Sequence, residues 1–297
     1  MEYLGIDIGG TKISCALINE QGEIIKPHGS INDSEIEKFQ TPKSVDEIKN
    51  LLTRIIAKYD EAEFAAIATA GAVNNENTGI LGSTANMPQG YADINFQNLS
   101  NKKVFIENDA NAASYAEYKI GASRGYKNSI MLTLGTGVGG GIIIDGKLLK
   151  GKLGAAGEMH FPLSRHKRRK CTCGFYDCFE AYASGNGLKI TAQEIYRNNK
   201  ITTYDVIDDA KRGDKRALLA LETWQNDIAL GCVALANIFD PDCIVLSGSM
   251  EQFVDTERME RFVNENIVTT PTKIFHARAG NYAGMIGAVL LALDKAK

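Results

Sequence analysis

The sequence predicts an α/β protein with mixed sheets and two like domains. Expected strands and helices alternate along the 297 residues, which is typical of α/β architectures. A unit of strand, glycine-rich turn and strand also occurs near residue 4 and again near residue 130. A duplicated unit of this kind indicates two like domains that face one cleft, and the length suits about two domains.

Composition excludes several classes of protein. The 33 Lys and Arg residues against 36 Asp and Glu residues give a formal net charge of −3, so no strong field attracts phosphate backbones or anionic lipids. No uninterrupted apolar run approaches the ~18 residues of a membrane span. The start, Met1–Gly5, lacks a basic region followed by an apolar one. We expect a soluble, cytoplasmic protein that binds neither nucleic acid nor membranes.

The first domain is expected over residues 1–115. A helix is predicted over Ser44–Tyr59, with Ser44 as its N-cap, because apolar residues recur there at helical spacing. A second helix is predicted from Asp109 to about Lys119. The expected strands are short runs bounded by turns or polar residues: Tyr3–Ile8, Ile13–Ile18, Glu23–Lys26, Ala65–Thr69 and Val104–Glu107.

The second domain is expected over residues 116–282. A long helix is predicted over Asp214–Phe239, with Leu218, Ile228 and Cys232 on one face, and a polar loop over about 158–180. A helix rich in small residues, about 283–297, is expected to pack back on the first domain. The expected strands are Ile130–Leu134, Gly141–Ile144 and Cys243–Leu246.

Two glycine-rich turns are candidate phosphate sites. Gly9-Gly10-Thr11-Lys12 and Gly135–Gly140 leave backbone N–H groups unobstructed by a Cβ. Neither fits the P-loop or the dinucleotide fingerprint, so a triphosphate held between them explains the pair better. For Gly135–Gly140, the alternative is a glycine-rich turn that only closes a tight hairpin. Asp7, beside the first turn, is suited either to holding hydrated Mg²⁺ or to forming the turn.

Polar residues also gather where a strand meets a helix. In Glu107-Asn108-Asp109-Ala110-Asn111 the amides suit the recognition of hydroxyl groups. Asp109 is therefore a candidate functional carboxylate, and its alternative role is that of a helix N-cap.

Three of the six cysteines crowd into a short stretch. Cys171, Cys173 and Cys178 supply three thiolates, one ligand short of a tetrahedral zinc site, and His160 or His166 is the candidate fourth ligand. Unligated cysteines are the alternative. The neighbouring basic run Arg165–Lys170 is expected to be a solvated loop rather than a site for an anionic partner.

Five motifs in order carry a family resemblance: Leu4–Lys12, Glu107–Asn111, Leu134–Gly140, Gly154–Glu158 and Cys171–Ala181. Together they resemble the ROK family of bacterial sugar kinases and sugar-responsive repressors, over essentially the whole chain. The resemblance implies the two-domain actin-like ATPase (ribonuclease H-like) fold, with a cleft between the domains.

The resemblance also implies residue roles. Asp109 matches the general base that takes the proton from the sugar hydroxyl as it attacks the γ-phosphate. The implied sugar contacts are Gly71, Asn86, Asn108, Asp109, Glu158, His160 and Glu180. The implied contacts to ATP and Mg²⁺ are Asp7, Gly9, Gly10, Thr11, Lys12, Gly135, Thr136, Gly137 and Gly139. The implied structural zinc ligands are His160, Cys171, Cys173 and Cys178.

Three departures from the family pattern matter. Glu158-Met159-His160 is one residue shorter than the usual Glu-x-Gly-His, so His166 remains an alternative ligand. Ala70-Gly71 replaces the frequent Pro-Gly, which leaves the substrate open. Ser247-Gly248-Ser249 stands where a glycine run near the adenosine is expected.

The implied activity is ATP- and Mg²⁺-dependent phosphorylation of a hexose or N-acetylhexosamine at the 6-hydroxyl. N-acetylmannosamine, glucose and N-acetylglucosamine are the candidate substrates, and a homodimer or homotetramer is expected. The alternatives are a sugar-sensing regulator, a non-catalytic sugar-binding protein and a kinase that uses polyphosphate. We expect no winged-helix domain, because the first strand begins at Tyr3.

Overall fold

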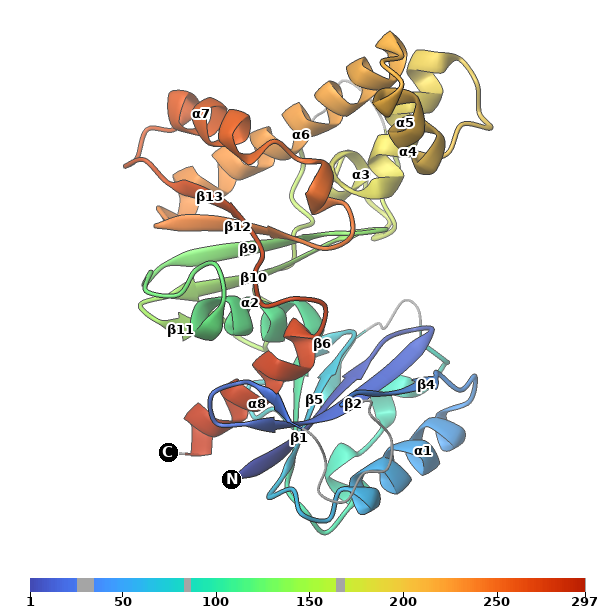
Figure 1. Ribbon diagram of the computed structural model, residues 1–297, viewed down its shortest axis with the longest axis vertical. Coiled ribbons are helices and arrows are strands. Elements are labelled where there is room, and N and C mark those ends of the chain that lie inside the picture. Colours follow the sequence, from blue (N-terminus) through green and yellow to red (C-terminus); the bar gives the residue numbers. More distant parts are fainter. Residues whose placement is uncertain (26–34, 83–86, 164–168, 297) are drawn as a thin grey trace. The chain divides into compact units, whose positions relative to one another are not determined.

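The computed structural model describes residues 1–25, 35–82, 87–163 and 169–296 (Figure 1). Their contacts divide the chain into two units. Unit 1 comprises Met1–Gly125, Gly141–Gly157 and Arg278–Lys297, and unit 2 comprises Tyr126–Gly140 and Glu158–Ala277. This division differs from the expected domains chiefly in Gly141–Gly157, which packs with unit 1.

Within the described residues, unit 1 contains a mixed sheet with strand order β3-β2-β1-β5-β8, and β4 pairs with β2. Strand β1 is antiparallel to β2 and parallel to β5, and β5 is parallel to β8. A short hairpin, β6-β7, stands apart from this sheet. The bounds are β1 Glu2–Ile8, β2 Lys12–Asn19, β3 Ile24–Ile25, β4 Glu37–Gln40, β5 Ala65–Thr69, β6 Ala72–Val73, β7 Ile80–Leu81 and β8 Val104–Asn108.

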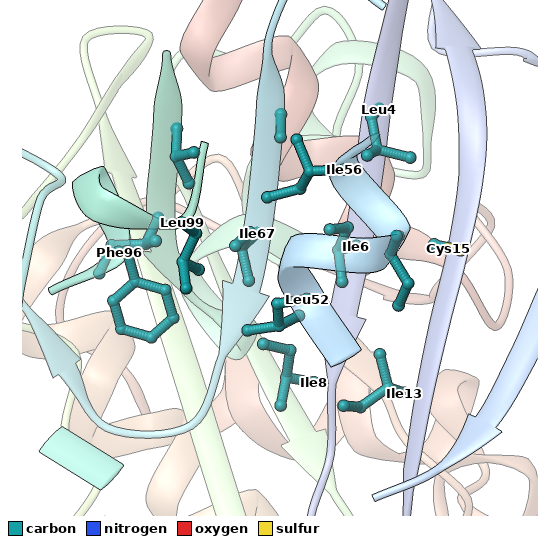
Figure 2. Packing of buried hydrophobic residues seen from close by; sticks show 14 of the residues in the cluster. Leu4, Ile6, Ile8, Ile13, Cys15, Leu52, Ile56, Ile67, Phe96 and Leu99 are labelled. Atoms are coloured by element: carbon teal, nitrogen blue, oxygen red, sulfur yellow. The ribbon is translucent and has the colours of Figure 1, made fainter. Parts of the chain in front are cut away.

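Both faces of this sheet are covered. Helix α1 (Val45–Lys58) and the 3₁₀ helices η1 (Tyr91–Asp93) and η2 (Phe96–Leu99) contribute to the core on one face. In Figure 2, β1 residues Leu4, Ile6 and Ile8 lie in one cluster with Leu52 and Ile56 of α1. Ser44 caps α1, as predicted, by accepting from the N–H of Glu47.

Helices α2 (Asp109–Ile120) and α8 (Ala283–Ala296) contribute to the core on the other face of the sheet. They approach closely at Gly287, where an added Cβ would lie 1.7 Å from the backbone oxygen of Ala112. A side chain at this position would therefore separate the two helices.

The register aligns the carboxyl ends of three parallel strands. Asp7 of β1 pairs with Ala68 of β5, which in turn pairs with Glu107 of β8, and Thr69 pairs with Asn108. In open α/β sheets, ligands bind beyond these ends. The edge formed by Asp7, Thr69 and Asn108 is therefore the first place to look for a site in unit 1.

The second sheet has strand order β11-β10-β9-β12-β13 over the described residues, and the unit boundary falls within β10. Strand β12 is parallel to β9 and β13. The strands are β9 Ser129–Leu134, β10 Val138–Ile144, β11 Lys147–Leu148, β12 Cys243–Ser247 and β13 Lys273–His276. The helices of unit 2 are α3 Glu180–Ala183, α4 Gly185–Tyr196, α5 Thr203–Lys211, α6 Lys215–Phe239, η3 Glu251–Phe253 and α7 Thr256–Asn266.

Helix α6 corrects one detail of the sequence interpretation. Ile228 and Cys232 are buried as expected, but Leu218 is 49% exposed, and Ala217 and Trp224 occupy the buried face instead. The indole N–H of Trp224 donates to the carbonyl oxygen of Ala183 (2.9 Å), which ties α6 to α3. None of the helices in the described stretches combines the length and apolar character needed to cross a membrane.

Candidate functional site

The first glycine turn connects β1 to β2 in unit 1. The N–H of Gly9 donates to the carbonyl oxygen of Lys12 (3.0 Å), and Gly10, Thr11 and Lys12 are exposed. The buried Thr41 holds this turn from outside. Its hydroxyl donates to the oxygen of Gly9 (2.6 Å) and its N–H to the oxygen of Thr11 (3.1 Å). The sequence interpretation missed Thr41, whose partners are distant in the chain.

Two carboxylates interact at the carboxyl edge of this sheet. The pKa of Asp7 is raised to about 6, chiefly by burial and also by the charge of Asp109, while Lys12 opposes the shift. The first turn of α8 also lies close, since an added Cβ at Gly284 would be 3.8 Å from the Asp7 carboxyl carbon. Two mutually repelling carboxylates of this kind are a donor set that suits Mg²⁺.

The junction of β8 and α2 shows which residue caps the helix. Asn108 is the N-cap: its Oδ1 accepts from the N–H of Asn111 (3.0 Å), and its Nδ2 donates to the carbonyl oxygen of Gly71 (3.1 Å). Asp109 is the first helical residue, its side chain is exposed, and its Oδ1 accepts from the N–H of Ala110 (2.8 Å). The N-cap alternative for Asp109 is therefore wrong, because Asn108 fills that role.

A buried tyrosine lies near the two carboxylates. Tyr91 Oη and Thr69 Oγ1 are 2.7 Å apart. Burial raises the pKa of the Tyr91 phenol, its hydrogen bond with Thr69 lowers it, and the charges of Asp109 and Asp7 raise it. Tyr91 therefore belongs to the same neighbourhood, although the sequence analysis did not identify it.

The second glycine turn lies in unit 2 and contacts a carboxylate. The N–H of Gly135 donates to the oxygen of Gly137 (3.0 Å), and the N–H of Val138 donates to Glu180 Oε2 (3.1 Å). An added Cβ at Gly137 would lie 2.5 Å from that same oxygen. A side chain at position 137 would therefore displace the Glu180 carboxylate from this contact.

Glu180 also reaches the cysteine loop. Its Oε1 accepts from the hydroxyl of Thr172 (2.6 Å) and lies 3.7 Å from Cys171 Sγ. One carboxylate thus connects the second glycine turn to the loop that contains the thiols. In this structure Glu180 contacts protein groups with both oxygens.

The described residues bring His160 together with the three thiols. The candidate ligand atoms of His160, Cys171, Cys173 and Cys178 all lie within 4.8 Å of one another. Cys171 Sγ is 3.7 Å from His160 Nδ1, and Cys173 Sγ is 3.5 Å from Cys178 Sγ. Ligands of a tetrahedral zinc ion with Zn–S of ~2.3 Å stand about 3.8 Å apart, so the spacing and the donor types fit zinc.

The other ring nitrogen of His160 faces Glu158: Nε2 lies 3.6 Å from Glu158 Oε2. A carboxylate behind a metal-binding histidine fixes the orientation of its ring. His166, the alternative ligand, lies outside the described residues, as does Asn86.

Arg169 corrects the interpretation of the basic run. Its guanidinium is buried, donates to Thr191 Oγ1 and Glu194 Oε2 (3.0 Å each), and stacks 4.5 Å from the ring centre of Tyr182. Arg169 thereby anchors the cysteine loop to α3 and α4. Lys170 is exposed, as expected for a solvated loop, and Arg165–Arg168 lie outside the described residues.

The turn after β12 packs beside the second glycine turn. Gly248 has a φ of +90°, and an added Cβ would lie 2.4 Å from the oxygen of Leu134, the last residue of β9. The N–H of Met250 donates to this oxygen (3.0 Å). The single glycine of Ser247-Gly248-Ser249 is therefore required by close packing within unit 2.

The expected site residues fall into two groups. Those described in unit 1 are Asp7, Gly9, Gly10, Thr11, Lys12, Gly71, Asn108 and Asp109. Those in unit 2 are Gly135, Thr136, Gly137, Gly139, Glu158, His160, Cys171, Cys173, Cys178 and Glu180.

Comparison with known proteins gives consistent matches. The model of a family described as the ROK family matches residues 3–295. A glucokinase from Thermotoga maritima is 29% identical over 270 residues, covering 85% of this chain and 83% of that protein. An N-acetylmannosamine kinase from Haemophilus influenzae is 28% identical over 305 residues, covering 99% and 96%.

The structure of a ROK family glucokinase from Streptomyces griseus in complex with glucose and AMPPNP is also similar. It superposes with a TM-score of 0.80 at 27% identity, covering 99% of this chain and 100% of that one. This likeness confirms the α/β fold class of the actin-like ATPases that the sequence motifs imply.

Proposed function

The chain belongs to the ROK family, and from this premise we propose that it is an ATP-dependent sugar kinase. Its substrate is a hexose or an N-acetylhexosamine, phosphorylated at the 6-hydroxyl, with N-acetylmannosamine, glucose and N-acetylglucosamine as candidates. Relatives named glucokinase and N-acetylmannosamine kinase, both aligned over most of this chain, support this substrate class.

One observation carries the assignment of the general base. Asp109 is exposed at the carboxyl edge of the sheet, and Asn108 caps α2 in its place. The helix N-terminus stabilises its negative charge. We assign to Asp109 the acceptance of the proton from the sugar 6-hydroxyl. The sugar oxygen forms a bond to the γ-phosphorus, and the bond between that phosphorus and the leaving ADP oxygen breaks.

The remaining proposed roles concern ATP, Mg²⁺, the sugar and zinc. The exposed residues Gly10, Thr11 and Lys12 and the second turn, with Gly135, Thr136, Gly137 and Gly139, would contact ATP phosphates, and Asp7 would hold Mg²⁺ through its hydration shell. When bound, Mg²⁺ neutralises charge on the transferring phosphoryl group. Gly71, Asn86, Asn108, Glu158, His160 and Glu180 remain the proposed sugar contacts. The sulfur and nitrogen donors of unit 2 would hold a structural zinc ion.

Release of ADP from Mg-ATP tests the proposal across N-acetylmannosamine, glucose, N-acetylglucosamine, mannose and fructose, with polyphosphate as a second donor. We expect strong turnover on one sugar. Asp109→Asn should lower it about 10²–10⁴-fold, because a positioned base contributes that much. The control is Asp46→Asn, an exposed aspartate in the first turn of α1.

Near-wild-type turnover by Asp109→Asn would remove Asp109 from the mechanism. Sugar binding without turnover on any donor would favour the regulator or the non-catalytic binding protein. A homodimer or homotetramer, the boundary near residue 115 and the cytoplasmic location stay predictions.

A further inference from the structure

A buried ion pair lies directly beneath the proposed catalytic junction. Glu107 is the residue of β8 before Asn108, and its side chain is 2% exposed. Its Oε2 lies 2.7 Å from Lys150 Nζ, and the Lys150 side chain is 10% exposed. Neither residue belongs to the implied site, and both lie in unit 1.

The two oxygens of Glu107 contact different parts of the unit. Oε1 accepts from the backbone N–H of Asn108 (2.9 Å) and from Nδ2 of Asn111 (3.4 Å). Oε2 accepts from Nδ2 of Asn77 (2.8 Å) as well as from Lys150. The carboxylate therefore connects the strand–helix junction to two segments that are distant in sequence.

Both segments are themselves held firmly. Asn77, in the β6-β7 hairpin that follows Gly71, is buried and also donates to the oxygen of Ile106 (2.6 Å). Lys150 also donates to the oxygen of Asn74 (3.0 Å). Four residues after Lys150, an added Cβ at Gly154 would lie 1.8 Å from the oxygen of Val73. The ammonium group of Lys150 is therefore held beside Glu107 by a segment that itself packs against Val73 and Asn74.

The energetics of the Glu107–Lys150 ion pair indicate that it does more than stabilise the fold. Burying two charges costs about as much as their attraction returns, and well-packed apolar residues often replace such a pair without loss. The geometry, in contrast, is specific. Asn108 is held through its N–H by Glu107 and through its amide by Gly71, so the residue before Asp109 has little freedom.

We propose that Glu107 and Lys150 are positioning residues that fix Asn108 and Asp109 in the orientation needed for phosphoryl transfer. This inference rests on the proposed kinase function. Small displacements of a catalytic group, of the order of 1 Å, cost about 10²-fold in rate. Loss of the pair therefore lowers kcat more than it raises KM.

The experiment compares Glu107→Gln, Lys150→Met and the double variant, with Lys119→Met as control. Lys119 forms a half-exposed ion pair with Asp294 near the far end of α2. For each protein we would measure kcat, KM for sugar and ATP, the unfolding midpoint and the exchange rate of the Asn108 amide proton.

Each single variant should lose kcat by about 10- to 100-fold, with KM changing less than about threefold, and Lys119→Met should resemble wild type. Lys150→Arg should recover part of kcat because it keeps a charged donor. The double variant should regain stability relative to the single variants, since neither member of the pair is left without the other, yet keep the low kcat and the faster Asn108 exchange.

A double variant that regains both stability and kcat would overturn the inference, because the pair would then be purely structural. A normal kcat in every variant that folds would overturn it as well. If wild-type protein phosphorylates no sugar, the kinase proposal fails by itself. The exchange rate of the Asn108 amide then still decides whether the pair orders the junction.

Discussion

Replacing Asp7 with asparagine should stabilise the metal-free protein at neutral pH. Burial and the neighbouring Asp109 raise the pKa of Asp7 from 3.8 to about 6. Because the folded state binds this proton more tightly than the unfolded chain does, the contribution of Asp7 to stability is greatest below pH 3.8. It declines as the pH rises from 3.8 through 6 and is lost above that window.

The shift of about two pKa units corresponds to on the order of 3 kcal/mol, since one unit is worth 1.36 kcal/mol. Asparagine removes the charge while keeping the shape of the side chain. Asp7→Asn should therefore exceed wild type in free energy of unfolding by up to about 3 kcal/mol at pH 7.5. The two proteins should converge at about pH 3.5, where Asp7 is protonated in both the folded and the unfolded state.

Urea denaturation without added divalent cation measures the free energy of unfolding at both pH values. Asp46→Asn, which removes an exposed carboxylate, is the control. Added Mg²⁺ should stabilise wild type but not Asp7→Asn, and the variant should lose kinase turnover. A variant that is less stable than wild type at pH 7.5, or equally changed at both pH values, would refute the reasoning.

Two further predictions concern the cysteine loop and the packing beside the ion pair. His160→Ala and Cys173→Ser should each reduce bound zinc from about one ion per chain to a small fraction. The control, Cys243→Ala, alters a lone buried thiol and should retain the zinc. Metal analysis measures the zinc content, and full retention by both loop variants would disprove the site. Gly154→Ala should cost about 2–5 kcal/mol in urea denaturation, because its Cβ meets a backbone oxygen at a φ of +93°. Gly82→Ala, at a φ of +85° with open space, should cost only about 1–2 kcal/mol, and equal costs would contradict the packing argument.

The parts of the fold that depend on local pattern were predictable. Apolar runs and turns located β1, β2, β5, β8 and α2, and the Ser44 cap followed from residue type alone. The local signal failed where two adjacent residues suit one role. Asn108 and Asp109 are both good N-caps, and only the backbone geometry assigns the cap to Asn108.

Burial of long side chains was also beyond local pattern. Leu218 looked like a core residue of α6, but it is exposed and the small Ala217 beside it is buried instead. Arg169 looked solvated within a basic run, yet its guanidinium is buried and donates to Thr191 and Glu194 of α4. Such positions depend on partners that are far away in sequence.

The same physical device recurs in both units. The backbone N–H of Asn108, where β8 gives way to α2, and that of Val138, which begins β10, each donate to a carboxylate, namely Glu107 and Glu180. A buried or half-buried N–H must find an acceptor, and a charged acceptor forms a stronger bond than a neutral one. Each carboxylate is in turn held by a donor from another segment, Lys150 or Thr172. The backbone at both sites is therefore oriented by carboxylates that lie within the sequence motifs, and only the structure shows which donors hold those carboxylates in place.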